Sequence, residues 1–317
     1  FLLLVIPCGM LPFALGCALF LLASFGLLLL ALWRTFASHR WLYAASVLLA
    51  PATGFTIGSG QNAFLTSALI VGGFGVLLRR PHLAGVLLGL VTFKPQFWLL
   101  VPVALIAARH YSALAIAIVT AAAMACLSAA VLGIEPWQVW IEWMISPPPD
   151  AYREWLIAGR LQGESLYTNL ILLGAPNTLA NAGQIAALAL GGGCVWWCYS
   201  RPVRADLRLA VLLIATTLAA PHLGPYDAIL LAIAATSLFV RANEEGFRLG
   251  EMPVAMLVWM IQLFNPPGAF RIGLITPFLT AALIVYAMLR ASDMSGLSRA
   301  APSVPPLVRS RDVEPVA

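Results

Sequence analysis

The fold of this chain is decided by residues 85–96, which read GVLLGLVTFKPQ. Lys94 is the only lysine in the sequence, and it lies between one apolar run that ends at Phe93 and another that begins at Phe97. A lone ammonium group in such a place is either a functional charge buried in a membrane or the marker of a turn at the membrane surface. Which interpretation holds depends on how the flanking segments cross the membrane.

The composition is that of a multi-span membrane protein. Hydrophobic residues make up 61% of the chain and charged residues only 10%, whereas soluble domains carry roughly 25% charged residues. The net charge of +5 comes mostly from arginines that lie between apolar runs, which is typical of cytoplasmic loops. Membrane lipids are therefore the expected surroundings. Because the basic residues do not cluster on one polar face, no nucleic-acid partner is expected.

Residues 83–108 allow two topologies. Their length suits a single crossing of the membrane, yet both flanks carry arginines. A single crossing would put the arginine-rich loop 201–208 on the outer side, although basic loops tend to remain in the cytoplasm. A helical hairpin that turns at Lys94 and Pro95 keeps all these arginines inside. Pro95 favours the hairpin because it disfavours helix at the preceding residue and lacks an N–H group.

With this hairpin, the chain forms an all-α, polytopic transmembrane helical bundle. The uncharged turn 58–62 falls on the outer side, as does the loop 134–165, whose tryptophans suit a helix lying at the membrane interface. The loop 241–251 fits the distribution of charges least, because its glutamates outnumber its arginines. The predicted segments are 13–32, 41–57, 62–78, 83–93 with 97–108, 113–132, 178–199, 207–220 with 226–240, 253–264 and 272–290.

Three of these segments, 83–93, 209–220 and 253–264, are too short to span the bilayer alone. A helix of about 11 residues is roughly 17 Å long, little more than half the hydrocarbon core of about 30 Å. We therefore expect their turns below the outer surface, where irregular backbone is tolerated only inside protein or beside a water-filled cavity. The sequence thus predicts short broken helices on the outer side of the bundle.

The two ends of the chain lead to expectations about its domains. Residue 1 falls on the outer side of the predicted topology, and the sequence begins at Phe1 without a signal peptide. We therefore expect a truncated N-terminus that lacks at least one helix and the first outer loop. Residues 1–290 form the expected transmembrane domain, and the polar segment 291–317 is expected to be a disordered cytoplasmic tail.

Two groups of small residues are expected to serve packing. Gly85 and Gly89 have the spacing of close helix contacts. The cysteines all lie in apolar runs and are expected to be small packing residues. Cys194 and Cys198 share a helix face, but no histidine or carboxylate lies near enough in the sequence to suggest a metal site, and no cofactor is expected. The five cysteines are Cys8, Cys17, Cys126, Cys194 and Cys198.

Three ionisable residues fall inside the membrane region of this topology: Lys94, His222 and Asp227. All three map to the outer side, at the tips of the two broken hairpins. A charge at the centre of a membrane helix costs at least about 2.5–3.5 kcal/mol, so such residues are usually functional. The plainer alternatives are a snorkelling lysine, a packing histidine, and an aspartate that forms an ion pair or caps the following helix.

Uncharged polar residues map to the same side, namely Gln61, Asn62, Gln96 and Tyr226. Their amide and hydroxyl groups suit the hydroxyl groups of a sugar, although Gln61 and Asn62 would equally cap the helix that follows them. Lys94 can offset the charge of a phosphate, and His222 or Asp227 can serve as acid, base or orienting group. This set suits an anionic, lipid-linked substrate, but broken helices are equally typical of transporters.

Three stretches resemble the signatures of a known enzyme family. Residues 60–66 read GQNAFLT, residues 83–96 read LAGVLLGLVTFKPQ, and residues 221–227 read PHLGPYD. They are similar to stretches of the family-87 glycosyltransferases, and the resemblance runs over residues 1–227. These are bacterial integral-membrane enzymes of the GT-C fold, which include the mycobacterial phosphatidylinositol mannoside mannosyltransferases.

The resemblance implies an inverting, metal-independent transfer of a sugar, usually mannose, from a polyprenyl-phosphate donor to a lipid or glycan hydroxyl group outside the bacterial plasma membrane. In the GT-C fold the base that deprotonates the acceptor is an aspartate in the first outer loop, which is expected upstream of Phe1. Asp227 is then better suited to orient groups or to bind the sugar. The alternatives are a multi-span transporter or lipid-carrier translocase without transferase activity, and a non-catalytic membrane scaffold.

Overall fold

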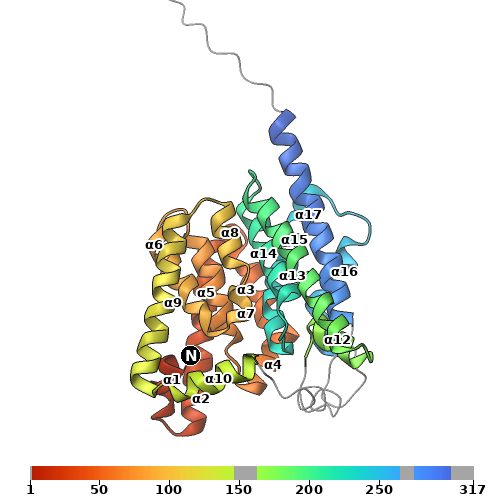
Figure 1. Ribbon diagram of the computed structural model, residues 1–317. Helices are drawn as coiled ribbons and strands as arrows, with labels where there is room; N and C mark the ends of the chain where they lie inside the picture. Colours follow the sequence, from red (N-terminus) through yellow and green to blue (C-terminus); the bar gives the residue numbers. More distant parts are fainter. Residues whose placement is uncertain (1, 146–162, 265–274, 301–317) are drawn as a thin grey trace, which may run out of the picture.

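The computed structural model describes residues 2–145, 163–264 and 275–300. Within these ranges the chain is built from helices and contains no strand, which confirms the predicted all-α bundle. Figure 1 shows the helices up to α9 gathered on one side of the bundle and those from α13 onward on the other. The two sides meet where α8 packs against α13 and α7 against α14.

Among the described residues, four straight helical segments are long and apolar enough to cross a membrane: α2 (Phe13–Thr35), α9 (Tyr111–Leu132), α13 (Asn177–Tyr199) and Pro225–Glu245. The last consists of η2 (Pro225–Ala228) and α15 (Ile229–Glu245). They differ sharply in burial, because 89% of the apolar window of Pro225–Glu245 is buried but only 6% of that of α9. The helix α15, which follows Asp227, therefore lies in the core of the bundle, whereas most of the surface of α9 is exposed and is expected to contact lipid.

The predicted span 41–57 is not one straight helix. The chain forms α3 (Arg40–Leu49) and α4 (Pro51–Ser59), which are bent by 57° at a break between them. The break lies at Ala50, whose extended backbone (ψ 133°) is the conformation that a following proline imposes. Pro51 then begins α4, where its missing N–H costs nothing. This second half contacts η2 and η3.

The segment that follows is a helical hairpin, as the sequence predicts. After α5 (Ala63–Val76), this hairpin runs through α6 (Pro81–Leu90), η1 (Val91–Phe93), α7 (Pro95–Trp98) and α8 (Val101–Ala107). The connections on either side of the hairpin, 77–80 and 108–110, lie at the same end of the bundle as the connection 200–204, at the top of Figure 1. We call this the arginine end.

Gly85 and Gly89 place α6 directly on α9. A Cβ atom added at Gly85 would lie 2.6 Å from the carbonyl oxygen of Ala113, and one at Gly89 would lie 2.5 Å from that of Ala117. The prediction that these glycines are helix contacts is confirmed. Each brings two backbones into a contact that no larger residue allows.

The remaining helices complete the second hairpin and the edges of the bundle. The chain turns back between α14 and α15, as predicted, and α10 lies across the end opposite to the arginine end (Figure 1). Trp137 and Trp140 lie on α10, as predicted for an interfacial helix, whereas Trp155 falls outside the described residues. These helices are α1 (Leu2–Gly9), α10 (Glu135–Ile145), α12 (Leu166–Leu172), α14 (Ala205–Ala219), α16 (Glu251–Met260), η3 (Ile261–Phe264) and α17 (Thr276–Ala300).

The sequence-based boundary at residue 290 does not coincide with the end of a helix. The last described helix, α17, continues to Ala300. Near the start of this extension, Asp293 forms an ion pair with Arg248, which lies in the loop between α15 and α16. Residues 301–317 of the predicted tail lie outside the described residues.

Buried ion pairs explain the acidic loop 241–251. Arg241 lies 2.9 Å from Asp206 and 2.7 Å from Glu244. Arg290 donates to Glu251 at 2.6 Å and lies 3.0 Å from Glu245. Because the two arginines are 4% and 3% exposed, their charges need these carboxylates as partners. The glutamates that fit the distribution of charges poorly are thus the counter-ions of two buried arginines.

Candidate functional site

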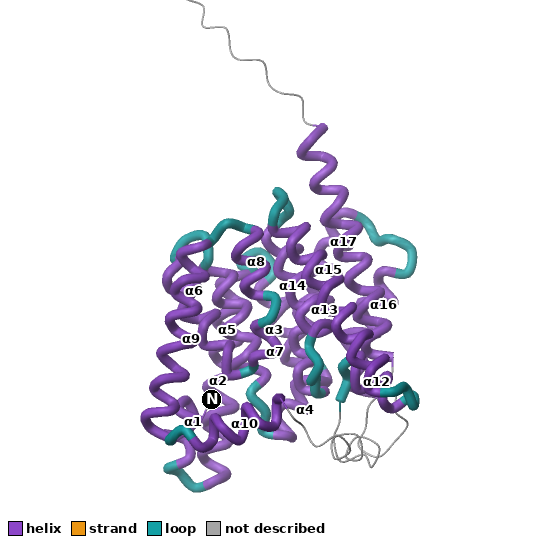
Figure 2. Tube along the Cα trace, viewed as in Figure 1, coloured by secondary structure: helices purple, strands orange, loops and turns teal. Residues whose placement is uncertain are grey.

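The two hairpins meet through one buried ion pair. Lys94 Nζ lies 2.7 Å from Asp227 Oδ1, and the two side chains are only 11% and 4% exposed. Lys94 comes from the break between η1 and α7, and Asp227 comes from η2 at the start of the central helix. Figure 2 shows in teal the non-helical segments that interrupt the bundle as well as those at its ends.

The backbone around Lys94 turns the lysine into the bundle. Lys94 has extended-type angles (φ −119°, ψ 79°), as expected for a residue that precedes a proline. Its N–H donates to the carbonyl oxygen of Val91 at 2.8 Å, and its own carbonyl accepts from the N–H of Phe97 at 2.9 Å. The residue therefore ends η1 and begins α7 at once, so its position is fixed on both sides.

Asp227 uses both carboxylate oxygens. Oδ1 accepts from Lys94, and Oδ2 accepts from the N–H of Gly224 at 3.2 Å. The N–H of Asp227 in turn donates to the carbonyl oxygen of Gly224 at 2.9 Å. The two plainer interpretations of this aspartate, an ion pair and a helix cap, therefore both describe real contacts. With its oxygens engaged in this way, Asp227 is arranged to hold Lys94 and its own turn.

Aromatic rings surround the ammonium group. Lys94 Nζ lies 5.1 Å from the ring centroid of Tyr226 and 5.3 Å from that of Phe97, both within the range of a cation–π contact. Thr56 of α4 donates to the carbonyl oxygen of Tyr226 at 3.3 Å. Gly224 lies against the ring of Tyr226, since an added Cβ would be 2.5 Å from the ring. The charge of Lys94 is thus enclosed by one carboxylate and two rings.

The other predicted site residues lie on segments next to this centre. Gln61 and Asn62 follow α4, which packs against η2, and both are partly buried. The Oδ1 atom of Asn62 is buried without a hydrogen-bond partner in the described part of the chain. Gln96 is partly buried in α7, whereas His222 is exposed in the turn that precedes η2. The structure therefore brings together Lys94, Tyr226 and Asp227, with the remaining residues on neighbouring segments.

A second buried polar contact next to this site was missed by the sequence analysis. The N–H of Glu164 donates to the carbonyl oxygen of Leu223 at 2.8 Å, and its side chain accepts from Gln262 at 2.8 Å. Glu164 and Gln262 are each 1% exposed. The sequence placed Glu164 in an outer loop, where a carboxylate needs no explanation. The only available signal was Gln262, an amide in an otherwise apolar segment.

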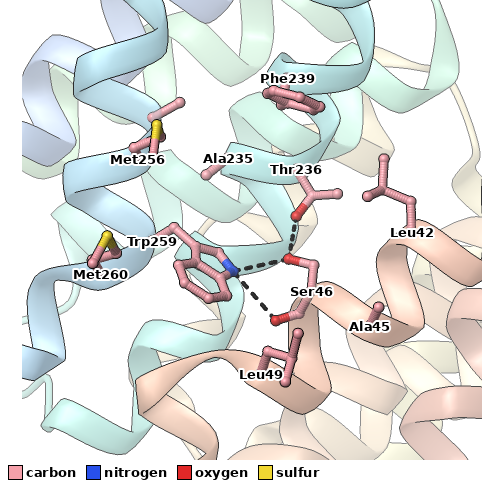
Figure 3. A pocket seen from close by; sticks show the side chains of 11 residues that line it. Leu42, Ala45, Ser46, Leu49, Ala235, Thr236, Phe239, Met256, Trp259 and Met260 are labelled. Carbon is pink, nitrogen blue, oxygen red and sulfur yellow. Dashed lines mark hydrogen bonds between the residues drawn. The ribbon is translucent and has the colours of Figure 1, made fainter.

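Apolar cavities lie within the bundle, and one of them begins next to Lys94. One, of about 440 Å³, is bounded by the segment before Lys94 and by α9 and α10, and its lining includes Thr92, Phe93, Trp98 and Trp137. The indole N–H of Trp98 is buried without a hydrogen-bond partner among the described residues. The other, of about 290 Å³, lies between α3, α15 and α16. Figure 3 shows Trp259 reaching across it to Ser46, with an Nε1 to Oγ distance of 2.9 Å.

The comparison with protein families identifies the chain. The model of "Glycosyltransferase family 87" matches residues 1–221, which is well over half of the sequence. The chain belongs to glycosyltransferase family 87. The comparisons with curated proteins and with solved structures gave no match.

Membership of family 87 makes this protein a membrane glycosyltransferase, which uses a sugar donor and an acceptor. The matched range includes Gln61, Asn62, Lys94 and Gln96. It ends before Asp227, so residues 222–227 of the third stretch lie outside the match. The family match therefore covers Lys94 but not Asp227. The evidence that connects the two hairpins of this family-87 glycosyltransferase is the ion pair of these residues in the structure.

Proposed function

We propose that this family-87 glycosyltransferase transfers mannose from a polyprenyl-phosphate donor to a hydroxyl group of a lipid or glycan acceptor, with inversion, on the extracytoplasmic side of a bacterial plasma membrane. The observation that carries the proposal is the buried ion pair of Lys94 with Asp227 at the meeting point of two broken helices. Ionisable groups at such a place in a membrane protein are expensive and are usually functional.

The proposed reaction places growing negative charge near Lys94. The bond between C1 of the sugar and the phosphate oxygen breaks, and its electron pair leaves with the polyprenyl phosphate. The acceptor oxygen forms the new bond to C1 and gives its proton to a base. A phosphodiester with one negative charge thus becomes a phosphomonoester with more, and an ammonium group beside it stabilises the transition state more than the ground state.

Lys94 and Asp227 have different proposed roles. The ammonium group has three N–H donors, of which one is directed to Asp227 at 2.7 Å, and we assign the others to the donor phosphate. Asp227 positions Lys94, because both of its oxygens are already engaged. Tyr226, Gln61, Asn62, Gln96 and His222 are proposed to bind the sugar or the acceptor.

The cavity of about 440 Å³ suits the apolar part of a lipid-linked substrate. It begins at Thr92 and Phe93, immediately before Lys94, and its lining is mostly apolar. A hydrocarbon chain in this cavity would bring the phosphate at its head close to the segment that carries the ammonium group. This arrangement supports a lipid-linked donor over a water-soluble nucleotide sugar, which has no apolar chain to bury.

Replacing Lys94 tests the proposal directly. In membranes supplied with polyprenyl-phosphate-mannose and lipid acceptors, Lys94→Met should reduce the rate of transfer by about a hundredfold or more, as expected for a lost electrostatic stabiliser. Lys94→Arg keeps the charge and should retain more activity. The matched control is Arg204→Gln, which removes an exposed cation at the arginine end and should leave transfer unchanged.

Two results would contradict the proposal at different levels. Undiminished transfer by Lys94→Met and His222→Ala variants would refute the assignment of the site. No transfer from any lipid-linked sugar by the unaltered protein would refute the function itself. Protein levels in the membrane must be compared, because Lys94→Met leaves the carboxylate of Asp227 buried without its partner, a change that costs about 3–5 kcal/mol of stability.

The helix breaks also favour a second candidate function. Segments η1 and η2 interrupt helices inside the bundle, as in transporters whose substrate site lies at such breaks. A lipid-carrier translocase of this kind would move a fluorescent polyprenyl phosphate across liposome membranes without any acceptor. Movement of the lipid without sugar transfer would favour the translocase, and transfer without movement would favour the enzyme.

A further inference from the structure

Charges at the arginine end are divided between two regions. On the side of α15 to α17, Arg241 and Arg290 have carboxylate partners within 3.0 Å. On the side of α8 and α13, the sequence places arginines at 79–80, 109, 201 and 208. Within the described residues, none of these forms an ion pair, since the nearby Asp206 is already engaged by Arg204 and Arg241. This second region thus carries positive charge without protein counter-ions.

Two of these arginines are held in place by aromatic rings and backbone. The guanidinium of Arg201 lies 4.5 Å from the ring centroid of Trp197 and donates to the carbonyl oxygen of Trp197 at 3.3 Å. The guanidinium of Arg208 lies 5.9 Å from the ring centroid of Tyr199 and donates to the carbonyl oxygen of Arg201. The side chain of Arg208 is therefore anchored to the backbone of Arg201, and neither guanidinium is at the end of a freely moving side chain.

One donor of this pair has no acceptor. The Nε atom of Arg208 is buried and has no hydrogen-bond partner in the part of the chain that the structure describes. An arginine N–H left in this way costs free energy unless an acceptor completes it. His110, in the turn after α8, is affected by the positive charge of Arg208, because burial and this nearby arginine both lower its pKa. The unpartnered N–H group and the local positive charge favour an anion as the ligand of this site.

The place of the pair in the bundle indicates the kind of anion. Arg201 follows the last turn of α13, one of the helices able to cross a membrane, and Trp196 on the same turn is 50% exposed. Tryptophan at the end of a membrane helix is typical of the headgroup level of the bilayer. A guanidinium pair at that depth meets lipid phosphates, and arginine binds phosphate oxygens with two parallel hydrogen bonds.

We propose that Arg201 and Arg208, supported by Trp197 and Tyr199, form a binding site for the phosphate group of an anionic membrane phospholipid. The site lies at the arginine end, where the helices of both hairpins begin, whereas Lys94 and Asp227 lie at the turns of these hairpins, away from that end. It does not depend on the proposed transferase activity, and its occupant is a structural lipid rather than a substrate. A zwitterionic lipid is a poorer partner because its ammonium group opposes the two arginines.

Lipid-dependent stability tests this site. The purified protein is titrated with phosphatidylglycerol or phosphatidylcholine in detergent, and the thermal unfolding midpoint is followed. We expect phosphatidylglycerol to raise the midpoint at lower concentrations than phosphatidylcholine does. The Arg201→Gln/Arg208→Gln variant should weaken phosphatidylglycerol binding by about 30-fold, since each basic residue near an anionic surface contributes roughly fivefold.

Controls separate charge, position and folding. Arg204→Gln removes an exposed cation of the same loop, which is paired with Asp206, and should bind phosphatidylglycerol as the unaltered protein does. Arg208→Lys keeps the charge and should lose less than Arg208→Gln, so a general folding defect can be recognised. Equal binding by the double variant, or an equal loss in Arg204→Gln, would overturn the proposal. Stabilisation by inorganic phosphate at the same concentrations would overturn the assignment to a lipid.

Discussion

At the scale of single residues, Asp227 is buried and forms contacts with both of its carboxylate oxygens. Its two oxygens join the tip of the first hairpin to the backbone of the second, through Lys94 and Gly224. A buried ion pair of this kind is weak evidence for stability, because both charges lose their hydration. Its value lies in fixing where an ammonium group stands, which is what an anionic substrate requires.

Gly224 should be sensitive to the smallest possible substitution. In Gly224→Ala, the new methyl group would lie 2.5 Å from the ring of Tyr226, although the backbone angle (φ −101°) permits alanine. We expect the ring to be displaced from Lys94, with a stability loss of about 1–3 kcal/mol and a clear decrease in transfer. Thermal unfolding and transfer assays measure the two effects.

The control for this prediction is Gly54→Ala on the neighbouring helix α4. An added Cβ at Gly54 meets no atom within 4 Å, so the variant should be as stable as the parent or more stable by about 0.4–1 kcal/mol. If Gly224→Ala transfers sugar at the normal rate, then the position of the Tyr226 ring is not needed for activity.

At the scale of elements, short helices are held in place by close contacts rather than by their own length. The helix α6 has only 10 residues, yet it packs along α9 through Gly85 and Gly89. This contact supports the first hairpin from the lipid-facing side. Lys94 follows Gly89 by only a few residues, so the position of the lysine depends on the contact of α6 with α9.

Enlarging Gly89 should therefore damage both the fold and the site. In Gly89→Leu, the side chain would begin 2.5 Å from the carbonyl oxygen of Ala117, and α6 would have to move away from α9. We expect a loss of about 3 kcal/mol in stability together with reduced transfer. Thermal unfolding of the purified variant provides the measurement.

Gly193→Leu on α13 is the matched control, because a Cβ at Gly193 meets no atom within 4 Å. It should unfold at the temperature of the unaltered protein. Similar unfolding temperatures for Gly89→Leu and Gly193→Leu would show that the contact of α6 with α9 is not required.

At the scale of the whole molecule, the arrangement of basic connections at one end predicts sidedness. Ser112 lies in the first turn of α9 at the arginine end, and Ser59 ends α4 near the opposite end; both are exposed. The positive-inside tendency predicts that the arginine end faces the cytoplasm. The broken helices and the proposed site then open toward the outside.

Cysteine labelling of intact cells tests this orientation. In a variant without the native cysteines, Ser59→Cys should react with a membrane-impermeant maleimide from outside, and Ser112→Cys should react only after the membrane is permeabilised. The reverse pattern would contradict the predicted orientation.

The sequence revealed the hairpins because local residues specify them. Lys94 with Pro95 and the flanking arginines predicted the turn within 83–108, and the same reasoning placed Asp227 on the same side. The contact of Lys94 with Asp227 rather than with His222 depends on side-chain geometry, which no local pattern specifies. The contact between Glu164 and Gln262 was missed for the same reason, since these residues are 98 positions apart.

Other differences arose from weighting one local signal over another. The apolar composition of 41–57 favoured a straight span, although Pro51 was sufficient to break it. The change to polar residues after residue 290 favoured a tail, whereas ion pairs with the preceding loop accompany a helix that continues to Ala300. In the first case a proline in the backbone, and in the second case an ion pair, accompanies a structure that hydropathy alone does not predict.

The separation of Lys94 from Asp227 has a consequence for biosynthesis. The two residues are 133 positions apart, and ribosomes add about 5–20 residues per second, so roughly 7–27 s pass between their syntheses. During this interval the first hairpin must wait at the insertion machinery with an unpartnered ammonium group. The bundle can therefore be completed only after the later helices have been synthesised. If a ribosome stalled before residue 227, we expect the incomplete chain to be degraded.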